Sequence, residues 1–363
     1  MSEEIRNYKC PCCDASLEFS AAKQTLHCDS CGNDYSVETL NQLAEADGGS
    51  TGSSEYNWET YEPREYGTDE EINIADYNCP SCGAQITGDD TLGATVCPYC
   101  GNATIIKGQF EGSLKPDYMI PFKVDKKMAM VEFEKACKKA PFLPDEFKNK
   151  KKIEEMAGVY VPFWMFDCRC DANITYNAQR VKCWSDSNYD YTKTSYYRLH
   201  RSGNMNFENI PVDGSIKADD EYMEAVEPFD YRDVVEFNSA YLSGYLADKY
   251  DVDDKQSLPR ANERVKKSAE DALASTCNSY SMVTVNNSNI RTSEGKVRYS
   301  LLPVWMLNIK YKGENFKFAI NGQTGKTVGN FPICKKKRNT YFAKVFGITV
   351  AIVMAGAMLF LNF

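Results

Sequence analysis

The alternation of apolar and polar positions divides the chain into segments with different expected structures. Runs rich in aromatic and β-branched residues predict strands, and apolar positions at helical spacing predict helices. Strands are predicted at Tyr118–Val124, Gly158–Phe166, 172–200, Ser281–Val285, Lys296–Tyr311 and Asn315–Ile320. Helices are predicted from the capping residue Asp125 to Lys138, with Met128, Val131, Phe133 and Ala136 on the apolar side, and over Phe237–Tyr250 and Pro259–Cys277. Residues 111–334 are therefore expected to form a mixed α+β globular region.

Two similar runs lie inside the predicted strands. Val161-Pro-Phe-Trp-Met-Phe-Asp167 resembles Leu302-Pro-Val-Trp-Met-Leu-Asn308. Because proline cannot donate to a strand ladder, each run is expected to bend or to lie at a sheet edge. The repetition favours two similar α+β lobes around a shared core, and coincidence is the alternative.

The C-terminal end has the pattern of a transmembrane helix. Val345–Phe363 carries no charge, and it follows the basic run Lys335-Lys-Lys-Arg338 and the aromatic pair Tyr341-Phe342. About 20 apolar residues span a bilayer, and basic residues mark the cytoplasmic flank. We therefore expect a basic juxtamembrane segment at 335–340, a single-pass helix at 341–363 in a bacterial cytoplasmic membrane, and the N-terminus in the cytosol. Small residues four apart, at Gly347, Ala351 and Ala355, allow self-association of that helix.

Residues 44–71 have the composition of a linker. Gly48–Ser54 is rich in glycine and serine, and an acidic stretch follows it. This composition predicts an acidic flexible tether. Its aromatic residues leave open a short docking motif; they are Tyr56, Trp58, Tyr61 and Tyr66.

Composition narrows the classes of function. The chain has 363 residues, which predicts two or three structural units, and a formal charge of −9, which disfavours phosphate backbones as partners. It has 15 cysteines but only two histidines, His27 and His200, which argues against histidine-based catalysis. No signal-peptide pattern follows Met1, so we expect metal ligands rather than a disulfide framework.

A four-cysteine module occurs twice near the N-terminus. Each copy has two Cys-x-x-Cys knuckles separated by 14 residues and ends in Cys-Gly-Asn. Two such knuckles supply four thiolates to one tetrahedral ion, in a site that is closed and therefore structural. We predict zinc ribbons at 1–43 and 72–110, with rubredoxin-like iron as the alternative. The predicted ligands of the two ions are Cys10, Cys13, Cys28 and Cys31, and Cys79, Cys82, Cys97 and Cys100. Cys12 is a spare thiol that could compete as a ligand.

Two further motifs give weaker signals. Cys168, Cys170 and Cys183 could form a third metal or redox site, but buried cysteines in a reducing compartment are the favoured interpretation. Gly322–Thr327 resembles a nucleotide-binding loop, yet Ile320 stands where such a loop needs glycine, and no helix pattern follows. A hairpin with a turn at Asn321-Gly322 is the better prediction.

The ribbons resemble the zinc ribbon of the general transcription factor TFIIB and the short zinc motifs of replication-restart helicases. The wider chain resembles a largely uncharacterised bacterial family of membrane proteins that carry a TFIIB-type zinc ribbon. The residues that carry this resemblance are Ile120-Pro-Phe122, Gly158-Val-Tyr-Val-Pro-Phe-Trp164, Tyr241-Leu-Ser-Gly-Tyr245, Leu301-Leu-Pro-Val-Trp305 and Asn321-Gly-Gln-Thr-Gly325. No helicase or polymerase motif accompanies them.

The sequence favours a binding protein over an enzyme. We expect a non-catalytic, membrane-anchored adaptor that faces the cytosol and contacts protein partners, because tethering raises effective concentration at the membrane. The alternative is a membrane-linked nucleic-acid binder in which aromatic residues such as Tyr99 stack on bases. That alternative is disfavoured because the ribbons lack a basic stripe; Lys9, Lys23 and Lys107 are the lysines in and beside them.

Overall fold

The protein is described by a computed structural model, which divides into two compact units. Unit 1 comprises Met1–Tyr61, Met165–Val212 and Leu258–Val297, and unit 2 comprises Glu62–Trp164, Asp213–Ser257 and Arg298–Phe363. The structure describes residues 10–361 except 13–14, 21–24, 38, 41–53, 65–73, 90–96, 103–105 and 109–114. For residues 74–75, 88–89, 106–108 and 355–361 it describes the backbone alone.

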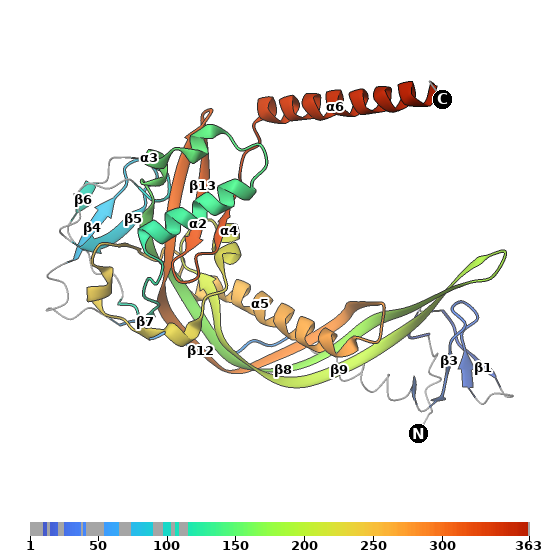
Figure 1. The fold of residues 1–363 in the computed structure, drawn as a ribbon. Coiled ribbons are helices and arrows are strands. Elements are labelled where there is room, and N and C mark those ends of the chain that lie inside the picture. The colour runs from blue at the N-terminus through green and yellow to red at the C-terminus, as the bar shows by residue number, and fades with distance from the viewer. Residues whose placement is uncertain are drawn as a thin grey trace. The chain divides into compact units, whose positions relative to one another are not determined.

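Unit 1 is built on long strands that a helix covers. β8 (Ala157–Ser185) and β9 (Asp190–Asp213) form a curved hairpin, β12 (Met282–Tyr311) is the next strand beside β8, and α5 (Asp254–Ala274) lies along them (Figure 1). Alternate β8 side chains such as Cys168, Cys170 and Ile174 are buried against Val265 of α5, which is the two-residue period of a half-buried strand. This unit also holds a small antiparallel sheet of β1 (Glu18–Ser20), β2 (Thr25–His27) and β3 (Asp34–Tyr35), and the 3-10 turn η5 (Ser275–Cys277).

Unit 2 is a mixed sheet with several helices, of which α6 is the longest among the described residues. The sheet order is β10 (Val235–Glu236), β7 (Tyr118–Met119), β12, β8, β11 (Leu246–Asp248), β5 (Gln85–Asp89), β4 (Ile74–Asn78) and β6 (Ile106–Gly108), with β13 (Glu314–Asn321) and β14 (Thr327–Gly329) continuing from β12. Its helices are α2 (Lys126–Lys139), α3 (Lys150–Ile153), α4 (Asp220–Val226) and α6 (Lys335–Leu361), with 3-10 turns η2 (Asp145–Lys148), η3 (Tyr231–Asp233) and η4 (Ser239–Leu242). An aromatic core joins α2 to β12 and β13 through Phe133, Trp305 and Phe318. The α+β class expected from the sequence is confirmed.

The two Pro-x-Trp-Met runs occupy equivalent positions in unit 2. Trp305 Nε1 donates a hydrogen bond of 2.8 Å to the carbonyl of Val124, and Trp164 Nε1 donates one of 2.8 Å to the carbonyl of Val252. The residue after each of these carbonyls is an aspartate whose side chain accepts a hydrogen bond from an amide in the first turn of the following helix. Asp125 does so for α2, and Asp253 does so for α5. Each tryptophan therefore fixes the entry to one helix.

The backbone around these tryptophans repeats as well. The amides of Gly214 and Gly322 donate to the carbonyls of Pro162 and Pro303, each at 2.8 Å. A Cβ at Gly322 would lie 2.6 Å from the Phe122 ring and 2.8 Å from Pro303, so the close approach requires glycine there. These matched contacts support the internal duplication, although the two prolines lie within strands that have neighbours rather than at a sheet edge.

One helix prediction was wrong, and another was confirmed in its extent but not in its buried face. Residues 237–250 form η4 and the strand β11 instead of one helix. In α2 the buried side chains are Ala129, Phe133 and Cys137, while Met128 and Val131 are exposed. The residues of α2 that face the sheet are therefore four apart, and they differ from the set of apolar positions that the sequence predicted. The predicted hairpin at 316–328 is confirmed by the antiparallel pairing of β13 and β14.

Part of the predicted flexible linker packs against unit 1. The amide of Glu55 donates to the carbonyl of Ile290 at 2.8 Å, and the amide of Glu59 donates to that of Gly295 at 2.8 Å. Trp58 Nε1 donates to Asn262 of α5 at 2.8 Å, and its ring meets Phe166 edge-on at 5.2 Å. This part of the predicted linker therefore packs on its own unit through Trp58, while residues 44–53 and 65–71 lie outside the described part.

The C-terminal helix α6 begins earlier than predicted, so the basic residues 335–340 form its first turns. Residues 362–363, and the side chains of 355–361, including Ala355, lie outside the description. Among the described residues, none of the helices combines the length and apolar character that a membrane crossing requires. The predicted transmembrane helix at 341–363 is thus not found in the described part of the chain.

Candidate metal centres

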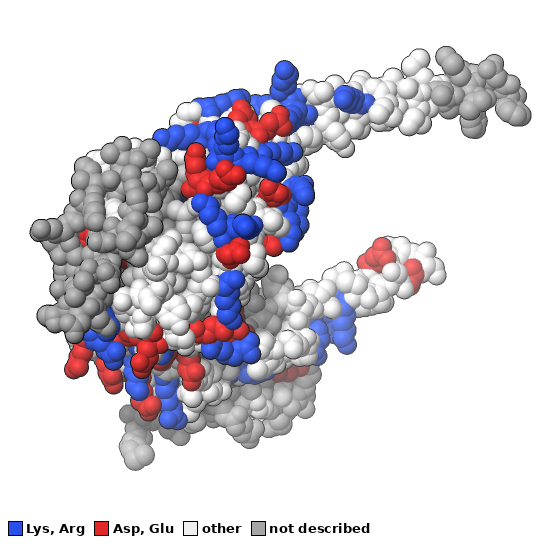
Figure 2. Space-filling model, turned by 60° about the vertical axis from the view of Figure 1, so that its left-hand side comes forward, with Lys and Arg blue, Asp and Glu red and all other residues white. Residues whose placement is uncertain are grey.

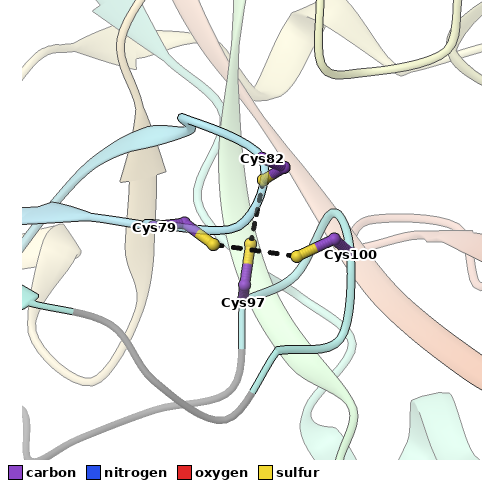
Figure 3. Close-up of side chains that lie close together, drawn as sticks. All are labelled: Cys79, Cys82, Cys97 and Cys100. Atoms are coloured by element: carbon purple, nitrogen blue, oxygen red, sulfur yellow. Dashed lines mark hydrogen bonds between the residues drawn. The ribbon is translucent and has the colours of Figure 1, made fainter.

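The second cysteine cluster comprises Cys79, Cys82, Cys97 and Cys100, all in unit 2. Cys79 and Cys82 lie in the turn between β4 and β5, and Cys97 and Cys100 lie in a second turn. The four thiols point toward one another (Figure 3), with 3.7 Å between the sulfurs of Cys79 and Cys100 and 3.7 Å between those of Cys82 and Cys97. Sulfurs bound at about 2.3 Å to one tetrahedral ion lie about 3.8 Å apart. The cluster therefore fits a tetrahedral ion with four thiolate ligands.

The turn geometry of the cluster is that of metal-binding knuckles. The amide of Gly83 donates to the carbonyl of Cys79, and the amide of Gly101 donates to that of Cys97. Both glycines have a positive φ, +71° and +69°, which disfavours residues with a Cβ. Gly32 repeats the pattern in the first ribbon, with a φ of +74° and a bond to the carbonyl of Cys28. The Cys-Gly-Asn ends predicted from the sequence thus have one structural role.

Electrostatics favours a thiolate at one position of the second cluster. Burial raises the pKa of Cys79, but the backbone amides of Cys82 and Ser81 and the neighbouring thiols outweigh it and lower that pKa to about 7. The pKa of Cys82 is raised, chiefly by burial. A cation would offset this cost, since metal binding and thiol deprotonation are coupled.

The first cysteine cluster comprises Cys10, Cys28 and Cys31, in unit 1. Their ligand atoms lie within 4.8 Å of one another, and the sulfurs of Cys10 and Cys31 are 3.5 Å apart. The predicted fourth ligand, Cys13, lies outside the described residues. Cys12 is not in the cluster; its sulfur accepts a hydrogen bond of 3.0 Å from the Tyr35 hydroxyl. The structure thus brings together seven of the eight predicted ligands.

A buried polar group holds the second cluster to its unit. Tyr99, between two of the cysteines, donates its hydroxyl hydrogen to Asp248 of β11 at 2.5 Å, and the Ser215 hydroxyl donates to the same oxygen at 2.5 Å. Asn308 of β12 donates to the carbonyl of Pro98. Burial raises the pKa of Asp248 to about 7, although the two hydroxyl groups oppose that shift.

One relative identifies the family. The uncharacterised protein YdjG of Bacillus subtilis (strain 168) is 34% identical over 358 residues, which cover 97% of this chain and 99% of the relative. The chain belongs to the YdjG family. No family model matches the chain, and no solved structure matches it. The resemblance to TFIIB-type zinc-ribbon membrane proteins therefore stays a prediction.

Two of the three remaining cysteine candidates are core residues in this member of the YdjG family. Cys168 and Cys170 are buried in the core of unit 1, as favoured, and Cys183 is exposed. Within the described residues, the two cysteine clusters are the groups of three or more potential metal ligands. Tyr99 is buried, so its ring is not available for stacking on bases. Sequence reasoning missed Asp248 as a site residue because it lies in a short, mostly apolar strand.

Proposed function

We propose that the protein is a non-catalytic adaptor that is held at the bacterial cytoplasmic membrane and binds protein partners on its cytosolic side. The observation that carries the adaptor proposal is the exposed tip of the β8–β9 hairpin. Trp184 and Tyr189 are 52% and 68% exposed there, and Trp184 stacks on Tyr191 at 5.4 Å. Aromatic side chains are enriched in protein–protein interfaces, and an exposed aromatic group marks such a surface.

The first ribbon lies beside the same hairpin. Asn33 donates to the carbonyl of Tyr196 at 3.2 Å, and the Cys12 thiol donates to it at 3.4 Å. We propose that ribbon and hairpin tip form one binding surface, and that Zn²⁺ occupies both cysteine clusters. A four-thiolate site has no open position for substrate, so zinc stabilises each ribbon and performs no chemistry. Zinc is preferred to iron because the ribbons are proposed to be structural.

Membrane anchoring rests on α6. From Val345 onward the sequence has no charge, and described side chains such as Phe346 and Ile352 are 72% and 66% exposed. A water-exposed apolar helix is unfavourable, so we propose that Val345–Phe363 enters the bilayer and that the basic residues before it stay in the cytosol. A Cβ at Gly347 would meet no atom within 4 Å, which leaves that face open for self-association.

Photo-crosslinking in living cells tests the adaptor proposal. A photoreactive amino acid at Tyr189 is expected to give protein adducts in the membrane fraction. The same amino acid at Lys267, which is exposed on α5 of the same unit, is the matched control and is expected to give few. Equal yields at both positions would count against a binding surface at the hairpin tip.

Nucleic acid is the second candidate partner. Arg180 lies over the Tyr280 ring at 5.0 Å from its centroid, and Lys182 and Lys193 flank the exposed aromatic residues. Cations interleaved with aromatic rings suit single-stranded nucleic acid. The same crosslinking experiment separates the two candidates. If nuclease treatment returns the adducts to the size of the free protein, the crosslinked partner is nucleic acid and the adaptor proposal is refuted.

A further inference from the structure

A groove in unit 2 lies between the first turns of α6 and the loop before η2. Its lining includes Phe142, Tyr311 and Tyr341, together with Lys336, Lys337 and Lys344. Two carboxylates, Asp145 and Glu146, also contribute to it. The groove thus combines aromatic surface with a majority of positive side chains, and none of these residues belongs to the cysteine clusters or to the hairpin tip.

Several contacts fix the loop against the start of α6 and so define the shape of the groove. The amide of Cys334 donates to the carbonyl of Phe142 at 2.9 Å. Lys337 Nζ donates to the carbonyl of Leu143 at 2.8 Å and pairs with Asp145 at 2.6 Å. Phe142 packs on Tyr341 at 5.3 Å and has a φ of 54°, an uncommon backbone conformation for a bulky residue. Such conformations persist where surrounding contacts impose them, and they gather at ligand-binding sites.

The charge of the groove contrasts with that of the molecule. Residues 335–344 contain four lysines, one arginine and no carboxylate, whereas the whole chain has a net charge of −9. Figure 2 shows Lys and Arg side chains gathered around the start of α6, with acidic side chains among them. Lys337 already offsets Asp145, while Lys336 and Lys344 are exposed and pair with no carboxylate in the described part of the chain.

We propose that this groove binds the headgroup of an anionic phospholipid, with Lys336 and Lys344 contacting its phosphate. The inference rests on the proposed membrane anchoring, which would place the groove at the depth of the headgroups. Lysines near the bilayer surface attract anionic lipids, and tyrosine and phenylalanine rings suit the boundary between headgroups and acyl chains. The exposed rings of Tyr341 and Phe342 lie on the turn of α6 between the two lysines.

Native mass spectrometry of the full chain in detergent micelles tests the proposal, with dioleoyl-phosphatidylglycerol and dioleoyl-phosphatidylcholine as the two probes. The wild-type protein is expected to retain the first in preference to the second. K336Q/K344Q is expected to weaken phosphatidylglycerol binding by roughly tenfold to thirtyfold, the effect of removing two lysines near an anionic surface. K126Q/K127Q removes the same amount of charge from the first turn of α2, which does not line the groove. It is the matched control and is expected to change phosphatidylglycerol binding little.

Equal binding of the two lipids by the wild-type protein, or full binding by K336Q/K344Q, would overturn the groove as a lipid site. Membrane fractionation with carbonate extraction separates this outcome from a failure of the proposed anchoring. K336Q/K344Q is expected to remain in the membrane pellet, because the uncharged run 345–363 is unchanged. A wild-type protein that carbonate extracts would refute the anchoring itself, whatever the micelle experiment shows.

Discussion

Asp248 is a buried carboxyl group at a position where the other half of the duplication has an apolar side chain. The parallel pairings of β7 with β12 and of β11 with β8 align Met119 with Ala247, so Ile120 corresponds to Asp248. A buried polar group is unfavourable unless it is hydrogen-bonded, and Tyr99 and Ser215 supply those bonds. The half that contains Asp248 thus has a connection to the second cysteine cluster where the other half has the apolar side chain of Ile120.

The raised pKa of Asp248 predicts a pH-dependent stability. In the unfolded chain an aspartate titrates near 3.9, whereas burial raises the pKa of folded Asp248 to about 7. Between these values the folded protein holds a proton that the unfolded chain has lost. The contribution of Asp248 to stability is therefore complete below about pH 4, and it is lost as pH rises through about 7, at up to about 1.4 kcal/mol per pH unit.

The variant Asp248→Asn tests this sign, because asparagine keeps the shape and most hydrogen bonds but does not titrate. The melting temperature of the variant relative to wild type is expected to rise from about pH 6 to about pH 8. Both proteins are measured with zinc in excess, so that metal release does not obscure the comparison. A difference that stays constant over that range would show that Asp248 is already ionised in the fold.

The sequence could predict site residues that lie close together along the chain, but it could not predict those that meet only through the fold. The cysteine clusters followed from Cys-x-x-Cys pairs, since each knuckle is a local turn. The bond between Tyr99 and Asp248 joins positions 149 residues apart, and neither residue type is informative alone. The same limit hid the groove, whose lining comes from the loop at Phe142 and from α6.

At the scale of elements, the segment around Trp58 behaves as an added edge of unit 1. Its backbone bonds to Ile290 and Gly295 run along β12, and a Cβ at Gly295 would lie 2.3 Å from the carbonyl oxygen of Asn57. Only glycine therefore permits this approach. The acidic, glycine-rich composition predicted a flexible tether and gave no sign that Trp58 would pack on Phe166.

Trp58 variants separate ring packing from hydrogen bonding. Trp58→Ala removes the contact with Phe166 and the bond to Asn262, so it is expected to weaken docking of the segment by roughly 2–3 kcal/mol. Trp58→Phe keeps an aromatic ring and loses only the donor, so about 1 kcal/mol is expected. Limited proteolysis within 54–61 measures the effect, since cleavage follows the population of the open segment.

The rank order of the three proteins decides the interpretation. Cleavage is expected to be fastest in Trp58→Ala, intermediate in Trp58→Phe and slowest in wild type. Equal rates in all three would mean that the Trp58 side chain does not hold the segment and that the backbone bonds alone do so.

Other elements show why local patterns gave the wrong structure at some positions. Residues 246–248 have helical spacing with their neighbours, yet β11 forms because β8 and β5 supply a partner on each side. The buried face of α2 is likewise set by the sheet that it covers rather than by its most apolar residues. Strand and helix preferences are weak compared with such tertiary contacts.

At the scale of the molecule, the duplication explains how one sequence repeat gives two non-identical halves. Trp164 and Trp305 make the same bond to the residue before a helix cap, so the repeated motif keeps one structural role. The faint sequence repeat predicted this much. It could not predict that β8 and β12, the strands that contain these tryptophans, extend through both units. The length of each strand depends on the strands that pair with it.

The two cysteine clusters differ in how they connect to the rest of the protein, and that difference is measurable. The second cluster is tied to unit 2 through Tyr99 and Asn308 and through the pairing of β5 with β11. The described hydrogen bonds of the first ribbon to the β8–β9 hairpin include those from Cys12 and Asn33 to the Tyr196 carbonyl. Loss of the metal from the second cluster should therefore reach farther than loss from the first.

Single ligand replacements test this asymmetry by hydrogen exchange with mass-spectrometric detection. Cys79→Ser and Cys28→Ser are each expected to lower the bound zinc from two ions to about one, because three thiolates hold the metal more weakly. Cys79→Ser is also expected to speed amide exchange in β11 and in the part of β12 around Asn308, since Tyr99 and the Pro98 carbonyl lose their fixed positions. Cys28→Ser is expected to speed exchange within Glu18–Tyr35 and to leave unit 2 unchanged. If Cys79→Ser altered exchange only within its own knuckles, the second ribbon would be an independent module, as the sequence alone suggested, and the Asp248 contact would contribute little to holding it.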